Sequence, residues 1–200
     1  MRKRIAPMEM LQNDKVILRD LLPEDIPSRI RWETVETEWQ NWDAPWEYEG
    51  LTDVQRQASM QVYLHSLHDR IAKIAALPPD APRSQLQIVV NDGSQKYIGW
   101  CSSYRIDAQY CYHPNGSLCA IGIDIPAMDA RRKGYGYAAL SLFIDYLRRC
   151  GESTLYLQTW SGNLRMLGLA HKLGFREVDR KVGIRTIRGQ SYDALTLRLL

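Results

Sequence analysis

The chain of 200 residues is long enough for one domain with a substantial hydrophobic core and short for two, so we expect residues 1–200 to form a single domain. Its net charge of +3 is too small to indicate a nucleic-acid-binding protein by charge alone. No signal-peptide-like apolar run follows the basic N-terminus, and no stretch is apolar over a membrane-spanning length. These features favour a cytoplasmic protein.

The four cysteines, Cys101, Cys111, Cys119 and Cys150, show no C-x-x-C spacing and do not cluster with histidines. We therefore expect no metal site and no disulfide, but reduced thiols that pack mostly as small buried hydrophobes. Eleven tyrosines and six tryptophans against two phenylalanines give many large side chains a polar tip, which suits a ligand site.

The N-terminal part alternates short and long elements. Residues 16–19 are strand-like, and the run 22–31 predicts a helix with a proline in its first turn. The segment 32–49 is acidic and aromatic without a clean period, which indicates a loop or a broken helix. Apolar residues then recur at helical spacing over 52–77, which predicts a long amphipathic helix that ends at Pro78.

The C-terminal part is richer in strands. The pattern predicts a β-hairpin of 86–90 and 97–104 around Asn91-Asp92-Gly93, a strand at 118–125, a helix at 134–149, a strand at 155–160, a helix at 163–172 and a final hairpin of 175–187 with 192–200. Antiparallel hairpins at both ends and one strand-helix-strand unit inside indicate an α/β fold with a mixed, mostly antiparallel central sheet flanked by helices.

Two glycines lie in a basic loop between a predicted strand and a predicted helix, in the run Arg131-Arg132-Lys133-Gly134-Tyr135-Gly136. The first N–H groups of a helix have no partner within the helix, and the helix dipole favours an anion there. Glycines let the backbone approach that anion closely. The run predicts a pyrophosphate-binding turn, although a basic loop that merely starts a helix is an equal alternative for these residues alone.

Other phosphate motifs fit less well. The pattern Gly134-x-Gly136-x-x-Ala139 matches the dinucleotide fingerprint, which also requires an acidic residue about 20 residues later to bind the ribose. The next strand, 155–159, ends without an acid, and the Walker pattern is absent. NAD and ATP are therefore disfavoured.

The glycine run resembles the acetyl-CoA loop of the GNAT family of acetyltransferases, which follows the pattern Arg/Gln-x-x-Gly-x-Gly/Ala. Two more features match downstream: Asn163 after a strand, and Lys172-Leu-Gly-Phe175 at the end of the next helix. The resemblance covers residues 85–200 well and the N-terminal part loosely. It implies a GNAT-like sheet and acetyl-CoA as co-substrate.

The resemblance also implies roles for individual residues. The backbone of 123–125 would pair with the pantetheine arm like an added strand, the glycine run would cradle the pyrophosphate, and Asn163 would hydrogen-bond the cofactor arm. The implied cofactor-binding residues are Ile123, Ile125, Arg131, Arg132, Lys133, Gly134, Tyr135, Gly136, Tyr137 and Asn163. Asn163 could equally be a plain helix N-cap.

Two acid–base groups common in the family are missing, because Ala170 stands where many members have a tyrosine and Ala120 where ribosomal-protein acetyltransferases have a glutamate. Asp124 shares a strand face with Ala120 and Gly122 and is the only ionisable residue of the three, so we expect it to be the general base. The stretch Gly122-Ile-Asp124, with residues 98–104 and 51–55, is also similar to aminoglycoside N-acetyltransferases, which carry an aspartate in that strand. The alternative is an exposed aspartate or one paired with Arg131.

The acidic, aromatic segment 32–49 suits a cationic amine through charge and cation-π contacts, unless its tryptophans only cover the sheet. We expect Trp42, Asp43, Trp46 and Tyr104 to bind the substrate. The expected partner is a small-molecule amine such as an aminoglycoside, or a peptide N-terminus. No nucleic acid and no membrane are expected, and a homodimer is left open.

Two rival functions remain. The missing tyrosine and glutamate are also compatible with a non-catalytic acyl-CoA-binding or sensing module of the same fold. The basic C-terminal hairpin would allow nucleic-acid binding, which would show strongly salt-dependent affinity.

Overall fold

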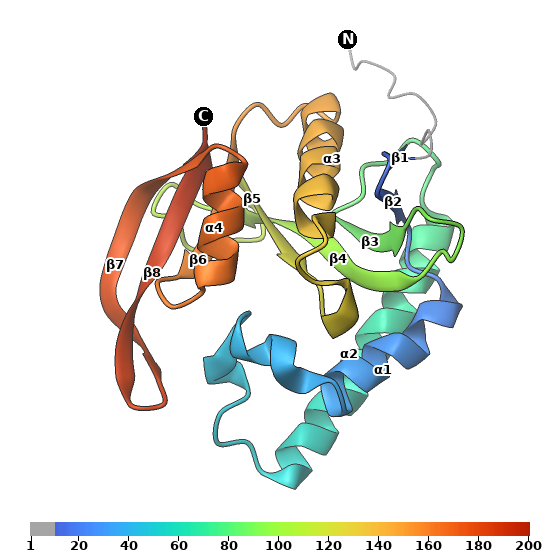
Figure 1. Cartoon of the computed structure of the whole chain (residues 1–200). Helices are drawn as coiled ribbons and strands as arrows, with labels where there is room; N and C mark the ends of the chain where they lie inside the picture. Colours follow the sequence, from blue (N-terminus) through green and yellow to red (C-terminus); the bar gives the residue numbers. More distant parts are fainter. Residues whose placement is uncertain (1–10) are drawn as a thin grey trace.

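One eight-stranded sheet with helices on both faces organises residues 11–200, the part of the chain that the computed structural model describes (Figure 1). The strands are β1 (Leu11–Gln12), β2 (Val16–Arg19), β3 (Gln85–Val90), β4 (Tyr97–Ile106), β5 (Leu118–Asp124), β6 (Leu155–Trp160), β7 (Phe175–Ile187) and β8 (Gln190–Leu199). The helices are α1 (Ile26–Thr34), α2 (Asp53–Ala76), α3 (Tyr135–Arg149) and α4 (Leu164–Lys172).

The strand order is β1-β2-β3-β4-β5-β6-β8-β7, and every neighbouring pair is antiparallel except β5 and β6. The parallel pair is joined through α3, as a strand-helix-strand unit requires. This confirms the predicted mixed, mostly antiparallel sheet flanked by helices.

The parallel pair separates halfway along its length. Residues 119–121 of β5 pair with 155–157 of β6, and beyond Ile121 β5 pairs only with β4 among the strands of residues 11–200. In the described part of the chain, the second half of β6, from Gln158 on, pairs only with β8. The split leaves one edge of β5 free over its last residues.

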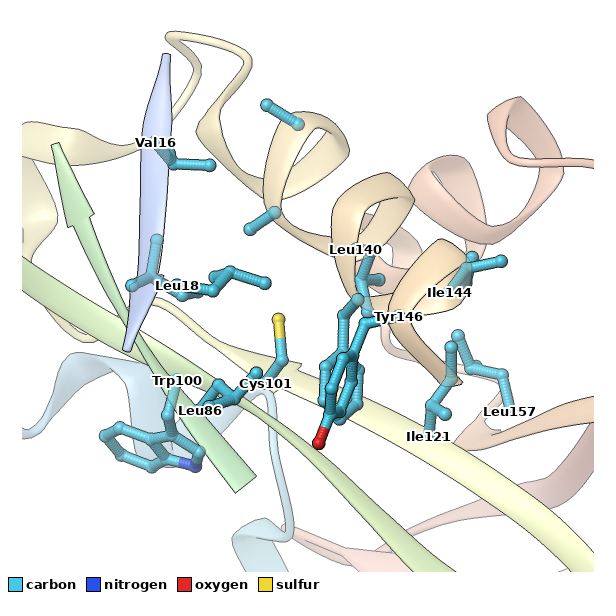
Figure 2. Packing of buried hydrophobic residues seen from close by; sticks show 14 of the residues in the cluster. Val16, Leu18, Leu86, Trp100, Cys101, Ile121, Leu140, Ile144, Tyr146 and Leu157 are labelled. Carbon is cyan, nitrogen blue, oxygen red and sulfur yellow. The ribbon is translucent and has the colours of Figure 1, made fainter. Parts of the chain in front are cut away.

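The main core lies between the sheet and α3 (Figure 2). Apolar residues of α3 recur at helical spacing, and Leu140 and Phe143 are completely buried on its inner face. Tyr146 adds a polar anchor, because its hydroxyl accepts a 2.6 Å hydrogen bond from the backbone N–H of Arg83. The helix predicted over 134–149 therefore runs from Tyr135 to Arg149 and buries one apolar face, although Leu142 is only half-buried.

Helix α2 is as long as predicted but buries far less than its amphipathic pattern suggests. A capping box between Thr52 and Gln55 starts it, and Leu67 is its only buried residue. Val54 and Val62 are 76% and 71% exposed. The physical reason is its position, since α2 packs alongside α1 rather than flat on the sheet (Figure 1). No helix within residues 11–200 combines the length and apolarity that a membrane span requires.

The acidic segment is a broken helix. After α1 ends, two short 3-10 turns follow at Thr37–Asn41 and Pro45–Glu47. Trp39 is buried: its indole N–H donates to the carbonyl of Trp32 at 2.8 Å, and its ring meets that of Trp100 edge-on at 5.6 Å. Some of the tryptophans in this segment therefore cover the sheet, as the plainer interpretation expected.

Cysteine packing follows the prediction only in part. Cys101 and Cys119 are buried, Cys150 is half-buried, and Cys111 is exposed in the loop between β4 and β5. All four thiols are free.

Strand β1, which is only two residues long, was not predicted from the sequence.

A close approach at Gly99 ties the sheet to the end of β5. A Cβ atom added at Gly99 would lie 2.0 Å from the carbonyl oxygen of Asp124, a backbone atom that cannot rotate away. We expect Gly99→Ala to destabilise the protein by about 1–3 kcal/mol in urea unfolding, the usual range for overpacking. Gly168→Ala in α4, where the added Cβ has no neighbour within 4 Å other than the adjacent backbone of its own helix, is the matched control and should be neutral or stabilising. Equal stabilities for the two variants would contradict this packing.

Candidate functional site

A cavity of about 1300 Å³ occupies the split between β5 and β6. Its wall is formed by the end of β5, the glycine run, the start of α4, the acidic segment and part of the β7–β8 hairpin. These elements come from distant parts of the sequence, so the fold brings most of the predicted cofactor residues and all the predicted substrate residues to one place.

The glycine run has the backbone of an anion cradle. Gly134 is the N-cap of α3 in the left-handed region, with φ +85°, and Arg132 is also left-handed, with φ +59°. Within residues 11–200, the backbone N–H groups of 132–137 donate to no other protein group. Six consecutive free N–H groups at a helix start suit a pyrophosphate.

The predicted loop residues differ in their access to the cavity. Arg132, Gly134, Tyr135 and Gly136 line it, as does Arg131. Two others lie outside its wall: Tyr137 is 41% exposed with the Lys172 ammonium 4.9 Å from its ring centre, and the carbonyl of Lys133 accepts from Lys15 at 3.4 Å.

The Arg131 side chain is already engaged by protein groups. Its Nε donates to the carbonyl of Ile125 at 2.9 Å, Nη2 to the carbonyl of Pro126 at 3.3 Å, and Nη1 forms an ion pair with Glu38. The alternative considered from the sequence, a pair between Arg131 and Asp124, is not present. Arg131 instead fastens the end of β5 to the acidic segment.

The free edge of β5 faces the same cavity. Ile123 and Ile125 both line it, and Ile123 pairs with Cys101 of β4 only on its other side. An extended chain with amide groups can add to such an edge as a further strand. The position suits the pantetheine arm.

Asn163 is the N-cap of α4 and also binds the acidic segment. Its side-chain oxygen accepts from the backbone N–H of Met166 at 3.0 Å, which caps α4, while its Nδ2 donates to the carbonyl of Trp42 at 2.6 Å. The Trp160 indole donates to the same carbonyl at 3.0 Å. The asparagine thus joins the cofactor side of the cavity to the acidic segment.

Asp124 lies on the cavity wall together with other acids. Burial raises the pKa of its carboxyl well above the usual value, the negative charge of Asp43 raises it further, and Arg29 opposes the shift. Burial, followed by the charge of Glu47, also raises the pKa of Asp43, to about 6. Both aspartates line the cavity, so two carboxyls of raised pKa are available to exchange protons there.

The remaining predicted substrate residues, Trp42, Trp46 and Tyr104, also line the cavity, but each already contacts another side chain of the protein. The guanidinium of Arg165 lies 3.9 Å from the ring centre of Trp42, and that of Arg185 lies 4.3 Å from that of Trp46. Each indole therefore already has a cation on one face. The hydroxyl of Tyr104 donates to Gln158 at 3.3 Å.

The two positions that lack the family acid–base groups are core positions. Ala170 is completely buried in the main core, and Ala120 packs with Ile106 and Tyr156 in a smaller cluster on β4, β5 and β6. Neither alanine lines the cavity.

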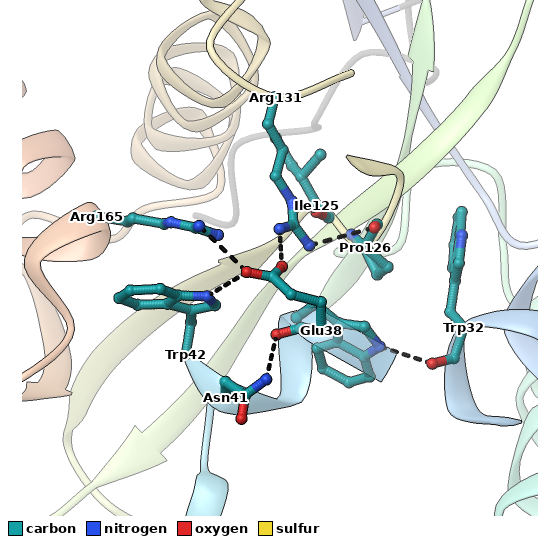
Figure 3. A network of polar contacts seen from close by, with 9 residues as sticks. Trp32, Glu38, Asn41, Trp42, Ile125, Pro126, Arg131 and Arg165 are labelled. Atoms are coloured by element: carbon teal, nitrogen blue, oxygen red, sulfur yellow. Dashed lines mark hydrogen bonds and ion pairs between the residues drawn. The ribbon is translucent and has the colours of Figure 1, made fainter. Parts of the chain in front are cut away.

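Glu38 was not predicted from the sequence. Its carboxylate accepts from Arg131, from Arg165 at 3.2 Å and from the Trp42 indole at 2.8 Å, as Figure 3 shows. Burial alone would raise its pKa, but these hydrogen bonds lower it to about 2. The sequence offered no signal that separates Glu38 from the other carboxylates of its segment.

Comparisons with known proteins agree with this geometry. A spermidine N-acetyltransferase from Vibrio cholerae, solved with CoA and spermine, has 18% identity over 94% of this chain and 96% of its own, with a TM-score of 0.64. An acetyltransferase from Bacillus anthracis has 10% identity, coverages of 96% and 98%, and a TM-score of 0.65. A ribosomal-protein-alanine N-acetyltransferase from Brucella melitensis has 17% identity, coverages of 92% and 98%, and a TM-score of 0.58.

These identities are low, so the three structures show a shared fold. No curated protein sequence matches the chain. The family model described as "Acetyltransferase (GNAT) domain" matches residues 15–176, which include the glycine run, the free edge of β5 and Asn163. This chain therefore belongs to the GNAT family of acyl-CoA-dependent N-acetyltransferases.

Proposed function

We propose that this enzyme acetylates a primary amine of a small polycationic molecule, such as a polyamine or an aminoglycoside. The observation that carries the choice of substrate is the acidic part of the cavity wall, which Asp43 and Asp124 both line. The charge of Asp43 raises the pKa of Asp124, and that of Glu47 raises the pKa of Asp43. A ligand with several positive charges would relieve this repulsion on binding.

The residues present fit the acetyl donor, acetyl-CoA, which supplies the thioester when bound. The free N–H groups of 132–137 would hold its pyrophosphate, and the free edge at Ile123 and Ile125 would align its pantetheine amides. Arg132, on the cavity wall, would add positive charge beside the phosphates.

Asp124 would act as the general base. An amine attacks only in its neutral form, so an ammonium substrate must first give up a proton. A carboxyl whose pKa is raised by burial is a stronger base than an ordinary aspartate and can take that proton near neutral pH. Asp43 would hold a second ammonium group of the same substrate.

A screen for CoA release tests the proposal. Purified enzyme with acetyl-CoA is offered polyamines, aminoglycosides and short peptides with free N-termini, because a ribosomal-protein acetyltransferase shares the fold. We expect turnover with the polycations, with KM rising as salt screens the acidic site. Turnover restricted to peptides would refute the substrate class. Acetyl-CoA binding without turnover on any amine would instead favour the non-catalytic sensing module.

A further inference from the structure

We propose that Glu38 is a positioning residue for acetyl transfer: by bridging Arg131 and Arg165 it holds Asp43 beside Asp124 in the cavity. This inference rests on the proposed function and deepens it. It gives the acidic segment a second role, as the element that assembles the carboxyl pair.

The bridge joins three separate parts of the chain. One oxygen of Glu38 pairs with Nη1 of Arg131, and the other accepts from Arg165 at 3.2 Å (Figure 3). Arg131 lies in the glycine run and Arg165 in α4, so one carboxylate links both cofactor-side elements to the acidic segment. The Arg131 side chain is only 17% exposed and Glu38 34%, so water screens this pair less than a surface ion pair.

Arg131 also hydrogen-bonds to the end of β5, the strand that carries Asp124. Its Nε and Nη2 donate to the carbonyls of Ile125 and Pro126, at 2.9 and 3.3 Å. Ile125 directly follows Asp124. A guanidinium that is held at both ends fixes the carboxyl end of β5 relative to Glu38.

Glu38 is also fixed to the residue before Asp43. Its Oε1 accepts from the indole of Trp42 at 2.8 Å, and the carbonyl of Trp42 is held by Asn163 at 2.6 Å and Trp160 at 3.0 Å. The placement of Asp43 therefore depends on contacts that run through Glu38 on one side and Asn163 on the other.

Charge explains why such a restraint is needed. Asp43 and Asp124 both line the cavity, and the negative charge of Asp43 raises the pKa of Asp124, so holding both carboxyls there costs free energy that fixed partners must offset. The charged and titratable groups that act on Asp124 and Asp43 are Glu33, Glu47 and Arg29, with Tyr48, Tyr63, Cys101 and Tyr104 nearby. Arg29 is the one cation among them, and it forms no ion pair with a carboxylate in residues 11–200.

The test is Glu38→Gln in the full chain, which keeps the side-chain size and removes the charge. We expect KM for the amine to rise about tenfold, the loss of one charge-assisted contact, while the Kd for acetyl-CoA measured without amine changes less than about threefold. The acidic limb of kcat/KM against pH should move to lower pH, because Asp124 loses the neighbouring charge that raises its pKa.

A double-mutant cycle separates positioning from direct electrostatics. If Glu38 acts through Asp43, adding Glu38→Gln to Asp43→Asn should shift the acidic limb no further. Shifts that add independently, or an amine KM and pH profile unchanged in the single variant, would overturn the inference. Thermal melting of each variant checks that it folds.

Glu36→Gln is the matched control. Glu36 lies two residues before Glu38, pairs with Arg31 at 2.8 Å and does not line the cavity, so its loss should leave KM and the pH profile unchanged. A failure of this inference can be told apart from a failure of the proposed function. A wild-type enzyme without turnover refutes the proposed function, whereas a turning-over enzyme that is insensitive to Glu38→Gln refutes only this inference.

Discussion

Replacing Asp124 with asparagine is expected to lower kcat/KM for the amine by about 10²–10⁴-fold, the range that general acid–base catalysis contributes. The amide has the shape of the carboxyl but cannot take a proton from the ammonium group. Steady-state kinetics of CoA release measures the loss. The Kd for acetyl-CoA should stay within a few-fold of the wild type, since the cradle at 132–137 is backbone. Activity at the wild-type level in this variant would remove Asp124 as the base.

The same variant makes a pH prediction with a defined sign. The base form of Asp124 exists only above its raised pKa, so wild-type kcat/KM should rise with pH through that pKa. The negative charge of Asp43 raises the pKa of Asp124, so the midpoint of this limb also depends on Asp43. Asp124→Asn should lose this limb and keep only the one due to the amine substrate. An unchanged profile would assign the limb to another group.

As the pH rises through the pKa of Asp124, the stability of the wild-type protein should fall while its kcat/KM rises. Because folding raises the pKa of Asp124, the folded state favours the protonated carboxyl. Wild-type stability is therefore lost as pH rises from the unfolded value near 3.8 through the raised folded value. The Asp124→Asn variant lacks this dependence, so the Tm difference in its favour should grow over that pH range. Such a gain would mark Asp124 as a residue kept for function rather than stability.

Much of the fold was predictable because its signals are local. The glycine at 134 and the apolar spacing of 138–147 define α3 and its inner face, and the flanking strands follow from their apolar runs. Helix α2 shows the limit of such signals. Its period predicts a helix but cannot say which partner covers it, and the structure leaves Val54 and Val62 exposed. Strand β1 is too short to leave a pattern.

The candidate site could be proposed from the sequence where one motif carries it and not where distant residues meet. The glycine run could be proposed as a pyrophosphate site because its six residues are consecutive. The Glu38–Arg131 pair joins residues 93 positions apart, so no periodicity or spacing indicates it. The same holds for Arg29, buried against the Trp100 ring at 3.4 Å from its centre, which lowers the pKa of Asp124 through its charge.

The other large effect is expected at the glycine run. Gly134→Asp should weaken acetyl-CoA binding at least about 100-fold, or about 2.7 kcal/mol. Two physical causes add: the carboxylate would lie beside the six free N–H groups that suit the pyrophosphate, and a non-glycine residue at φ +85° is strained by about 1–2 kcal/mol. Isothermal titration calorimetry with CoA measures the change, because CoA contains the pyrophosphate without the reactive thioester.

Gly134→Ala separates the two causes. The added methyl group meets nothing closer than the flexible Lys15 side chain at 3.7 Å, so alanine introduces the backbone strain without the charge. We expect it to lower the Tm and to weaken CoA binding much less than aspartate does. If both variants bind CoA equally weakly, strain alone explains the loss and the electrostatic argument fails. If Gly134→Asp binds CoA as tightly as the wild type, the pyrophosphate does not lie at the start of α3.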